Sequence, residues 1–116
     1  MRPGLRHQTG LAAEEIAARA YQARGAKVLA RRWRCRAGEI DLIVEEAGCL
    51  VFVEVRARRS LAEAATSLSP RKLARILGAA AAWMSAQNLS PDQNMRVDAA
   101  LIDRAGQVEI VENATL

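Results

Sequence analysis

The chain has 116 residues, which is enough for one domain with a single hydrophobic core. Hydrophobic residues make up 51% of it, and its formal net charge of +4 favours anionic partners, although charge alone is weak support for them. No stretch resembles a signal peptide or a membrane span, so we expect a cytoplasmic protein without membrane contacts. Two widely spaced cysteines and one histidine support neither a disulfide framework nor a zinc site.

Apolar periodicity and turn residues predict the element order αβββαβ, with a further short strand at the end. Residues 1–9 are expected to form a flexible tail and residues 10–116 a single domain. Helices are predicted over 11–24, closed by Gly25, and over 70–87, where Ser69 is the N-cap and Pro70 the first helical residue. The segment 58–69 is predicted to be irregular. Strands are predicted over 27–36, 38–44, 50–56, 95–102 and 108–111.

Two acidic residues of the first helix are expected to have different surroundings. Glu15 lies on the polar stripe and forms a favourable pair with Arg19, one turn later. Glu14 falls beside Tyr21, at the edge of the apolar side. Glu14 is therefore the carboxylate that can face the sheet.

The second and third strands each carry an acidic residue among aliphatic neighbours, where a charge is costly unless it is paired or used. If Ala47-Gly48 is the centre of the connecting turn, the register sets Asp41 opposite Glu54 and Glu39 opposite Arg56. Opposed carboxylates with Cβ atoms about 5 Å apart destabilise a sheet. A bound divalent cation would resolve the repulsion.

Asp41, Glu54 and the polar side chain at position 56 have a spacing that suits metal-assisted phosphodiester cleavage. Oxygen ligands would hold Mg²⁺ or Mn²⁺, and a neighbouring cation would stabilise developing negative charge. The alternative is a cross-strand salt-bridge cluster in which Arg56 neutralises the carboxylates. Spacing alone does not separate the two interpretations.

Basic residues gather in the first strand and at the start of the second long helix. Alternation places Arg32, Arg34 and Arg36 on one side of the strand and Trp33 and Cys35 on the other. These arginines either contact phosphates or protect a strand edge, and Trp33 either stacks on a base or packs in the core. Lys72 lies in the first turn of the second long helix, where the helix dipole disfavours positive charge. Contact with a phosphate would explain a cation there. The alternative is that Lys72 is a solvated charge at the helix end.

These motifs together resemble the bacterial YraN-like family over nearly the whole chain. The matching segments are Arg32-Trp33-Arg34 with Gly38-Glu39-Ile40-Asp41-Leu42-Ile43, then Val51-Phe52-Val53-Glu54-Val55-Arg56-Ala57-Arg58, Arg71-Lys72 and Arg96-Val97-Asp98. The linked pattern is far more specific than any one segment. The resemblance implies an α/β restriction-endonuclease-like core, similar to archaeal Holliday-junction resolvases, with a central mixed sheet flanked by helices.

The resemblance also implies site residues and partners. Its helix glutamate, strand aspartate and Glu-x-Lys pair would fall on Glu14, Asp41, Glu54 and Arg56, with the three carboxylates as ligands of Mg²⁺ or Mn²⁺. Arg32, Arg34, Arg36, Arg58 and Lys72 would contact nucleic acid. The expected substrate is structured or branched DNA, and cutting both strands would need two sites, as in a homodimer.

The chain departs from the family pattern at three positions. Arg56 stands where lysine is usual, and Ala13 and Arg32 stand where glycine and asparagine are common. Arginine stays charged and cannot act as a general base, so Arg56 can only orient or neutralise. A catalytically weak or inactive module that binds nucleic acid or assists assembly is therefore the rival hypothesis, and a structural partner for an acidic protein is a third.

Overall fold

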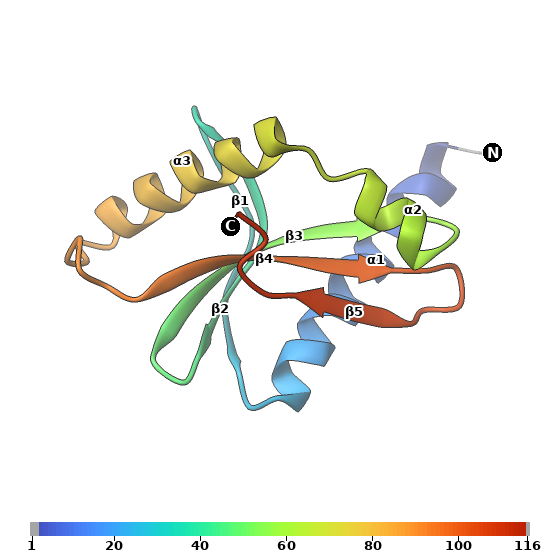
Figure 1. Cartoon of the computed structure of the whole chain (residues 1–116), viewed down its shortest axis with the longest axis horizontal. Coiled ribbons are helices and arrows are strands. Elements are labelled where there is room, and N and C mark those ends of the chain that lie inside the picture. Colours follow the sequence, from blue (N-terminus) through green and yellow to red (C-terminus); the bar gives the residue numbers. More distant parts are fainter. Residues whose placement is uncertain (1–2, 116) are drawn as a thin grey trace.

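The structure is a computed structural model that describes the backbone of residues 3–115 and the side chains of residues 12–115. Its five strands form one sheet in the order β1-β2-β3-β4-β5 (Figure 1). Only β3 and β4 are parallel, which makes the sheet mixed. The strands are β1 (Lys27–Cys35), β2 (Gly38–Glu46), β3 (Cys49–Ala57), β4 (Met95–Ile102) and β5 (Val108–Val111). The predicted α/β domain with a mixed sheet, and the predicted element order αβββαβ with a further strand, are confirmed.

Three helices cover the two faces of this sheet: α1 (Pro3–Ala23) on one face, and α2 (Leu61–Thr66) and α3 (Pro70–Ala86) on the other (Figure 1). The crossover between the parallel strands passes through α2 and α3, as a parallel connection requires. No described helix has the length and apolarity to cross a bilayer.

Two helix predictions need correction. The first helix begins at Pro3, not at residue 11, so it includes most of the predicted tail; proline is favoured at the first helical position. The segment predicted to be irregular contains α2, whose N-cap Ser60 accepts a hydrogen bond from the Glu63 N–H at 3.1 Å. The predicted start of α3 is confirmed, because Ser69 Oγ accepts from the Lys72 N–H at 3.2 Å.

Each face of the sheet has its own hydrophobic core. Tyr21 and Ala17 of α1 pack with Val51 and Val53 on one face. Phe52 and Trp83 meet edge to face in the other core, with ring centroids 5.8 Å apart, and Trp33 packs against this core. The interpretation of both tryptophans as core residues is confirmed.

The β2–β3 hairpin has the predicted register, with positive φ at both central residues, Ala47 (50°) and Gly48 (80°). Its ladder runs from Glu46 opposite Cys49 to Leu42 opposite Val53 and stops there. The outer ladders continue further, β1–β2 to Cys35 opposite Gly38 and β3–β4 to Ala57 opposite Ile102. The sheet therefore separates between β2 and β3, one residue before Asp41 and Glu54.

Candidate active site

Asp41 and Glu54 lie side by side where β2 and β3 separate. The Val55 backbone N–H donates to Asp41 Oδ2 at 2.8 Å, and the two carboxyl groups are in hydrogen-bonding contact. A hydrogen bond between two carboxyl groups requires a proton on one of them. The predicted juxtaposition is thus present, with a backbone donor added by the end of the ladder.

Burial raises the pKa of Asp41 to about 8, and the hydrogen bond and charge of Glu54 contribute in the same direction. The Val55 N–H and the Arg56 charge oppose this rise without cancelling it. At neutral pH the pair therefore keeps a proton. A cation placed between the two carboxylates would displace that proton.

Arg56 supplies positive charge at the same end of β3. Its Nη2 lies 3.4 Å from Glu54 Oε2, and both side chains are mostly buried. Its Nε is buried with no hydrogen-bond partner among the described residues. An unsatisfied buried donor is costly, and because this N–H is closed to solvent, an acceptor from outside the chain can reach it only after the side chain moves.

The expected pairing of Glu39 with Arg56 is wrong. Glu39 stands opposite Arg34 in the β1–β2 register, and Arg34 Nε lies 3.4 Å from Glu39 Oε2. The separation of β2 from β3 explains the difference, because the register that would join Glu39 to Arg56 ends at Leu42 opposite Val53.

Glu14 is held by a cation. Arg32 Nε donates to both of its carboxylate oxygens, at 2.7 and 2.9 Å. The Glu14 side chain is 14% exposed, against 43% for Glu15, which pairs with Arg19 and Arg31. The predicted difference between the two glutamates is confirmed. Among the described residues, Glu14 does not form a metal-binding group with Asp41 and Glu54.

The contact with Glu14 depends on a break in the alternation of β1. Arg31 and Arg32 both reach α1, whereas Trp33 packs in the core beneath α3. Arg32 has φ of 52°, in the left-handed region that non-glycine residues rarely occupy. The predicted separation of Arg32 and Arg34 from Trp33 and Cys35 is present, and the left-handed residue explains why Arg31 lies on the same side as its neighbour Arg32.

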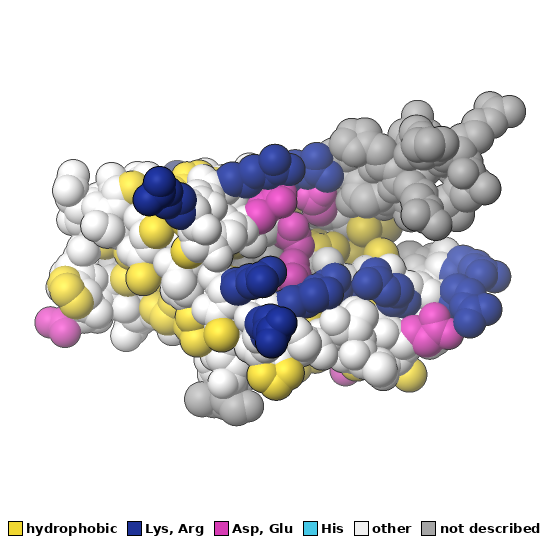
Figure 2. Space-filling model, turned by 90° about the horizontal axis from the view of Figure 1, so that it is seen from above, with side chains coloured by type: hydrophobic (Ala, Val, Ile, Leu, Met, Phe, Trp, Pro, Cys, Tyr) yellow, Lys and Arg dark blue, Asp and Glu magenta, His cyan; other side chains and the backbone are white. Residues whose placement is uncertain are grey.

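The other predicted phosphate contacts are exposed. Arg34, Arg36, Arg58 and Lys72 are all accessible to solvent. Arg75 of α3 lies against Gly38 at the start of β2, so the basic first half of α3 approaches the end of the sheet that carries Asp41. Figure 2 shows a group of acidic side chains in a hollow between two rows of Lys and Arg side chains.

The donor set fits a hard divalent cation in part. Asp41 and Glu54 offer carboxylate oxygens, and Mg²⁺ is commonly held by one or two carboxylates together with waters and substrate phosphates. Residues 12–115 contain no group of three or more acidic, His or Cys side chains close enough to hold a metal. The protein thus provides two adjacent ligands, and burial together with Glu54 raises the pKa of Asp41 although Arg56 lies close by.

Comparisons with known proteins give the family. The model of the uncharacterised protein family UPF0102 matches residues 13–102. The chain belongs to the UPF0102 family. A UPF0102 protein of Cereibacter sphaeroides is 44% identical over 108 residues, which cover 93% of this chain and 92% of the relative. One from Ruegeria pomeroyi is 45% identical, with 93% and 88% covered, and one from Azorhizobium caulinodans is 45% identical, with 93% and 82% covered.

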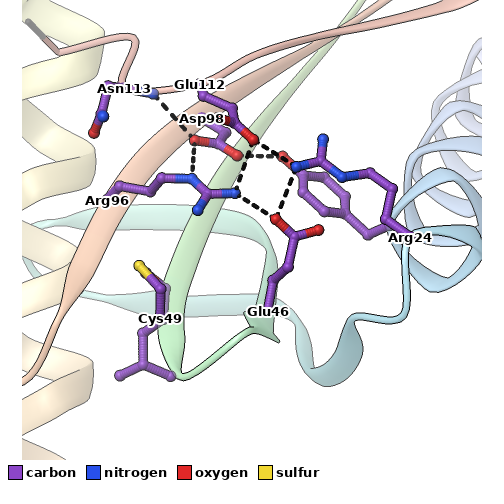
Figure 3. A network of polar contacts seen from close by, with 9 residues as sticks. Arg24, Glu46, Cys49, Arg96, Asp98, Glu112 and Asn113 are labelled. Atoms are coloured by element: carbon purple, nitrogen blue, oxygen red, sulfur yellow. Dashed lines mark hydrogen bonds and ion pairs between the residues drawn. The ribbon is translucent and has the colours of Figure 1, made fainter.

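A second polar cluster of this UPF0102 protein lies nearer the β2–β3 turn (Figure 3). Within it, Arg96 Nε lies 3.0 Å from Asp98 Oδ1. Asp98 is fully buried, and the Tyr21 hydroxyl donates to its Oδ2 at 2.7 Å. Burial and this hydrogen bond raise the pKa of Tyr21. Both oxygens of Asp98 are thus occupied away from Asp41, and Asp98 does not belong to the candidate site.

Glu46 connects the rest of this cluster. It accepts from Arg96 at 2.9 Å and from Arg24 at 2.7 Å, and Arg24 also pairs with Glu112 (Figure 3). Burial alone would raise the pKa of Glu46, but the hydrogen bonds of the two arginines hold it below its usual value. The cluster ties the end of α1 to β2, β4 and the residues after β5.

Sequence reasoning missed three contributors: the Val55 N–H, Arg75, and the Arg24–Glu46 connection. The Val55 N–H could not be recognised in the sequence, because every residue except proline has a backbone donor. Arg75 could be recognised, since it follows Arg71 by one helical turn and Lys72 by nearly one. Glu46 and Arg24 lie 22 positions apart, and only the position of α1 across the sheet joins them.

Proposed function

We propose that this UPF0102 protein is a metal-dependent nuclease with a restriction-endonuclease-like core that hydrolyses phosphodiesters in structured or branched DNA. The observation that carries the proposal is the Asp41–Glu54 pair, which is desolvated, holds a proton and lies next to Arg56. A purely structural role gives no reason to bury two acidic side chains and an unsatisfied Arg56 Nε together.

Asp41 and Glu54 would hold Mg²⁺ or Mn²⁺, which when bound polarises the phosphate and acidifies the attacking water. Asp41 is oriented for this by the Val55 N–H, which fixes Oδ2. Glu54 can accept the proton of the attacking water, and the positive charge of Arg56, which lies beside Glu54, can stabilise negative charge that develops on the phosphate. Arg56 is not a base, because its guanidinium keeps its proton.

Glu14 remains a proposed third ligand or water-positioning carboxylate. Its present partner, Arg32, is 40% exposed and could turn towards a phosphate of the substrate. Arg34, Arg36, Arg58 and Lys72 would contact phosphates, which predicts binding that is independent of base sequence and weakened by salt. A homodimer is also proposed, since cutting both strands of a branched substrate needs two sites.

The second candidate function is nucleic-acid binding or assembly without efficient cleavage. Arg56 favours it, because a lysine at this position could lose its proton and act on water, whereas arginine cannot. The fold and the basic surface would be the same in both cases. Only the chemistry at Asp41 and Glu54 separates the two functions.

The test is a titration of Mg²⁺ and Mn²⁺ with labelled duplex, single-stranded and four-way-junction DNA. Wild type is compared with Asp41→Ala, Glu54→Ala and Arg56→Lys, and with Glu109→Gln as a matched control on the exposed part of β5. We expect metal-dependent cutting that the first two substitutions abolish and the control leaves unchanged.

Two outcomes would contradict the proposal. If no metal or substrate yields cutting while Asp41→Ala tightens DNA binding, the carboxylates act only by repelling phosphates and the enzyme proposal fails. If the protein binds no nucleic acid at low salt, both candidate functions fail together.

A further inference from the structure

A cavity of about 450 Å³ opens at the carboxyl-terminal ends of the two parallel strands. Its walls are apolar and come from three elements: Ala12, Ala13 and Ile16 of α1, Ala57 of β3, and Ile102 of β4. Three arginines, Arg58, Arg59 and Arg104, stand at its border. Ligands of α/β proteins commonly bind at this end of parallel strands, in cavities of this size range.

The charged groups around this cavity leave an excess of positive charge. Asp103 also lines it, but its Oδ1 accepts from the Gln107 N–H at 2.9 Å and stabilises the β4–β5 turn. Arg59 is paired with Glu63, whereas Arg58 donates only to the Ala57 carbonyl, at 2.7 Å, and no ion pair is formed by Arg104 within residues 12–115. An occupant should therefore combine an apolar body with a negative charge.

The cavity begins one residue after the proposed active site. Arg56 and Arg58 are two strand positions apart, about 7 Å, which is short enough for a single nucleotide to connect them. Figure 2 shows hydrophobic side chains in a hollow beside the acidic group on the same face. Ala57 faces the α1 core, whereas Arg56 points to the opposite face. A DNA strand that passes round the end of β3 can thus place one phosphate at Arg56, the next at Arg58, and the base in the cavity on the α1 side.

We propose that this cavity holds an unstacked nucleobase next to the phosphate at the active site. This inference rests on the proposed nuclease function and narrows its substrate class. DNA with an unpaired nucleotide, such as a flap, a bulge or an open branch point, would be preferred over continuous duplex, whose bases cannot leave the stack without cost. The apolar walls offer no pattern of side-chain donors and acceptors, so the base identity should matter little.

The experiment measures dissociation constants by fluorescence anisotropy in EDTA, which prevents cutting. The probes are branched DNAs with one unpaired nucleotide, in which an abasic site replaces each base near the branch in turn. We expect one position at which the abasic site weakens binding about tenfold. Ala12→Phe, which fills the cavity from an exposed helix position, should weaken binding of the intact DNA equally and remove the abasic effect.

Ala81→Phe is the matched control, because Ala81 is also exposed on a helix but lines a different cavity. Ala81→Phe should leave the affinity for the intact DNA and the affinity for the abasic DNA both unchanged. A second readout uses 2-aminopurine at the sensitive position of DNA bound to wild type, so the test does not depend on the folding of Ala12→Phe. Its fluorescence should change on binding as the base leaves the stack.

The inference is overturned if DNA binds with the same affinity whichever base is missing, and in that case the nuclease proposal stands. If decanoate raises the thermal unfolding temperature of the protein and no abasic site changes DNA affinity, the cavity is a site for acyl anions, and the inference is also overturned. If no DNA is bound at all, the proposed function itself has failed.

Discussion

Replacing Asp41 with asparagine should stabilise the protein at alkaline pH. Asparagine is neutral and close to isosteric with the protonated carboxyl group that the structure favours. Its amide oxygen can accept from the Val55 N–H, and its NH₂ can donate to Glu54. Asp41→Asn therefore keeps the contacts of the pair and removes only the ionisation.

The pKa of Asp41 fixes both the sign and the pH range of this effect. Its ordinary value is 3.8 and its value in the folded protein is about 8. Between these two pH values the unfolded chain has released the proton and the folded protein has kept it, so the stability of wild type falls as pH rises. A rigid site would lose about 6 kcal/mol, and with water entry and local relaxation we expect about 2 kcal/mol. Asp41→Asn lacks this loss.

The assay is urea unfolding followed by circular dichroism from pH 4 to pH 9, without added metal. The advantage of Asp41→Asn over wild type should grow to about 2 kcal/mol near pH 8 and then level off. Glu109→Gln, an exposed acidic residue of β5, should follow wild type throughout. If Asp41→Asn is less stable than wild type at pH 8, or if the difference does not change with pH, the two carboxylates do not share a desolvated site.

Three further changes test other parts of the structure. Arg32→Asn should be more stable than Arg32→Ala by about 1 kcal/mol in urea unfolding, because both lose the contact with Glu14 but asparagine tolerates the positive φ better; equal stabilities would show that the backbone is not strained. Tyr21→Phe should cost about 1–2 kcal/mol, since it removes a donor from buried Asp98, and an unchanged urea midpoint would contradict this. Arg56→Lys should make metal-dependent cleavage rise with pH, whereas an unchanged pH profile would show that position 56 provides only a fixed charge.

The site could be predicted from the sequence as far as local rules apply. A two-residue turn with glycine fixed the β2–β3 register, and that register brought Asp41 to Glu54. Helical periodicity separated Glu14 from Glu15 in the same way. Both arguments need only neighbours along one element or across one hairpin.

The failures share a physical cause, which is that the sheet as a whole decides how far each ladder continues. The outer ladders hold β2 to β1 and β3 to β4, so the β2–β3 pairing ends early, and Glu39 pairs with Arg34 instead of Arg56. Arg31 and Arg32 lie on the same side of β1 because Arg32 has a left-handed backbone conformation, which no local sequence pattern indicates. The short helix α2 was missed because six residues carry too little periodicity.

The distribution of ion pairs explains why Asp41 is the centre of the candidate site. Two of its three carboxylates each have an arginine, since Glu14 has Arg32 and Glu54 has Arg56, and Glu39 beside the site has Arg34. Asp41 forms no ion pair within residues 12–115 and instead has a backbone N–H and a proton shared with Glu54. A proton and a divalent cation can each neutralise the negative charge of Asp41 and Glu54, so they compete for the same position. Metal binding at the site should therefore release a proton, and it should weaken as the pH falls below the pKa of Asp41. Isothermal titration of Mn²⁺ in buffers of different ionisation enthalpy would measure that proton, and binding without proton release would show that the ion does not lie between these two carboxylates.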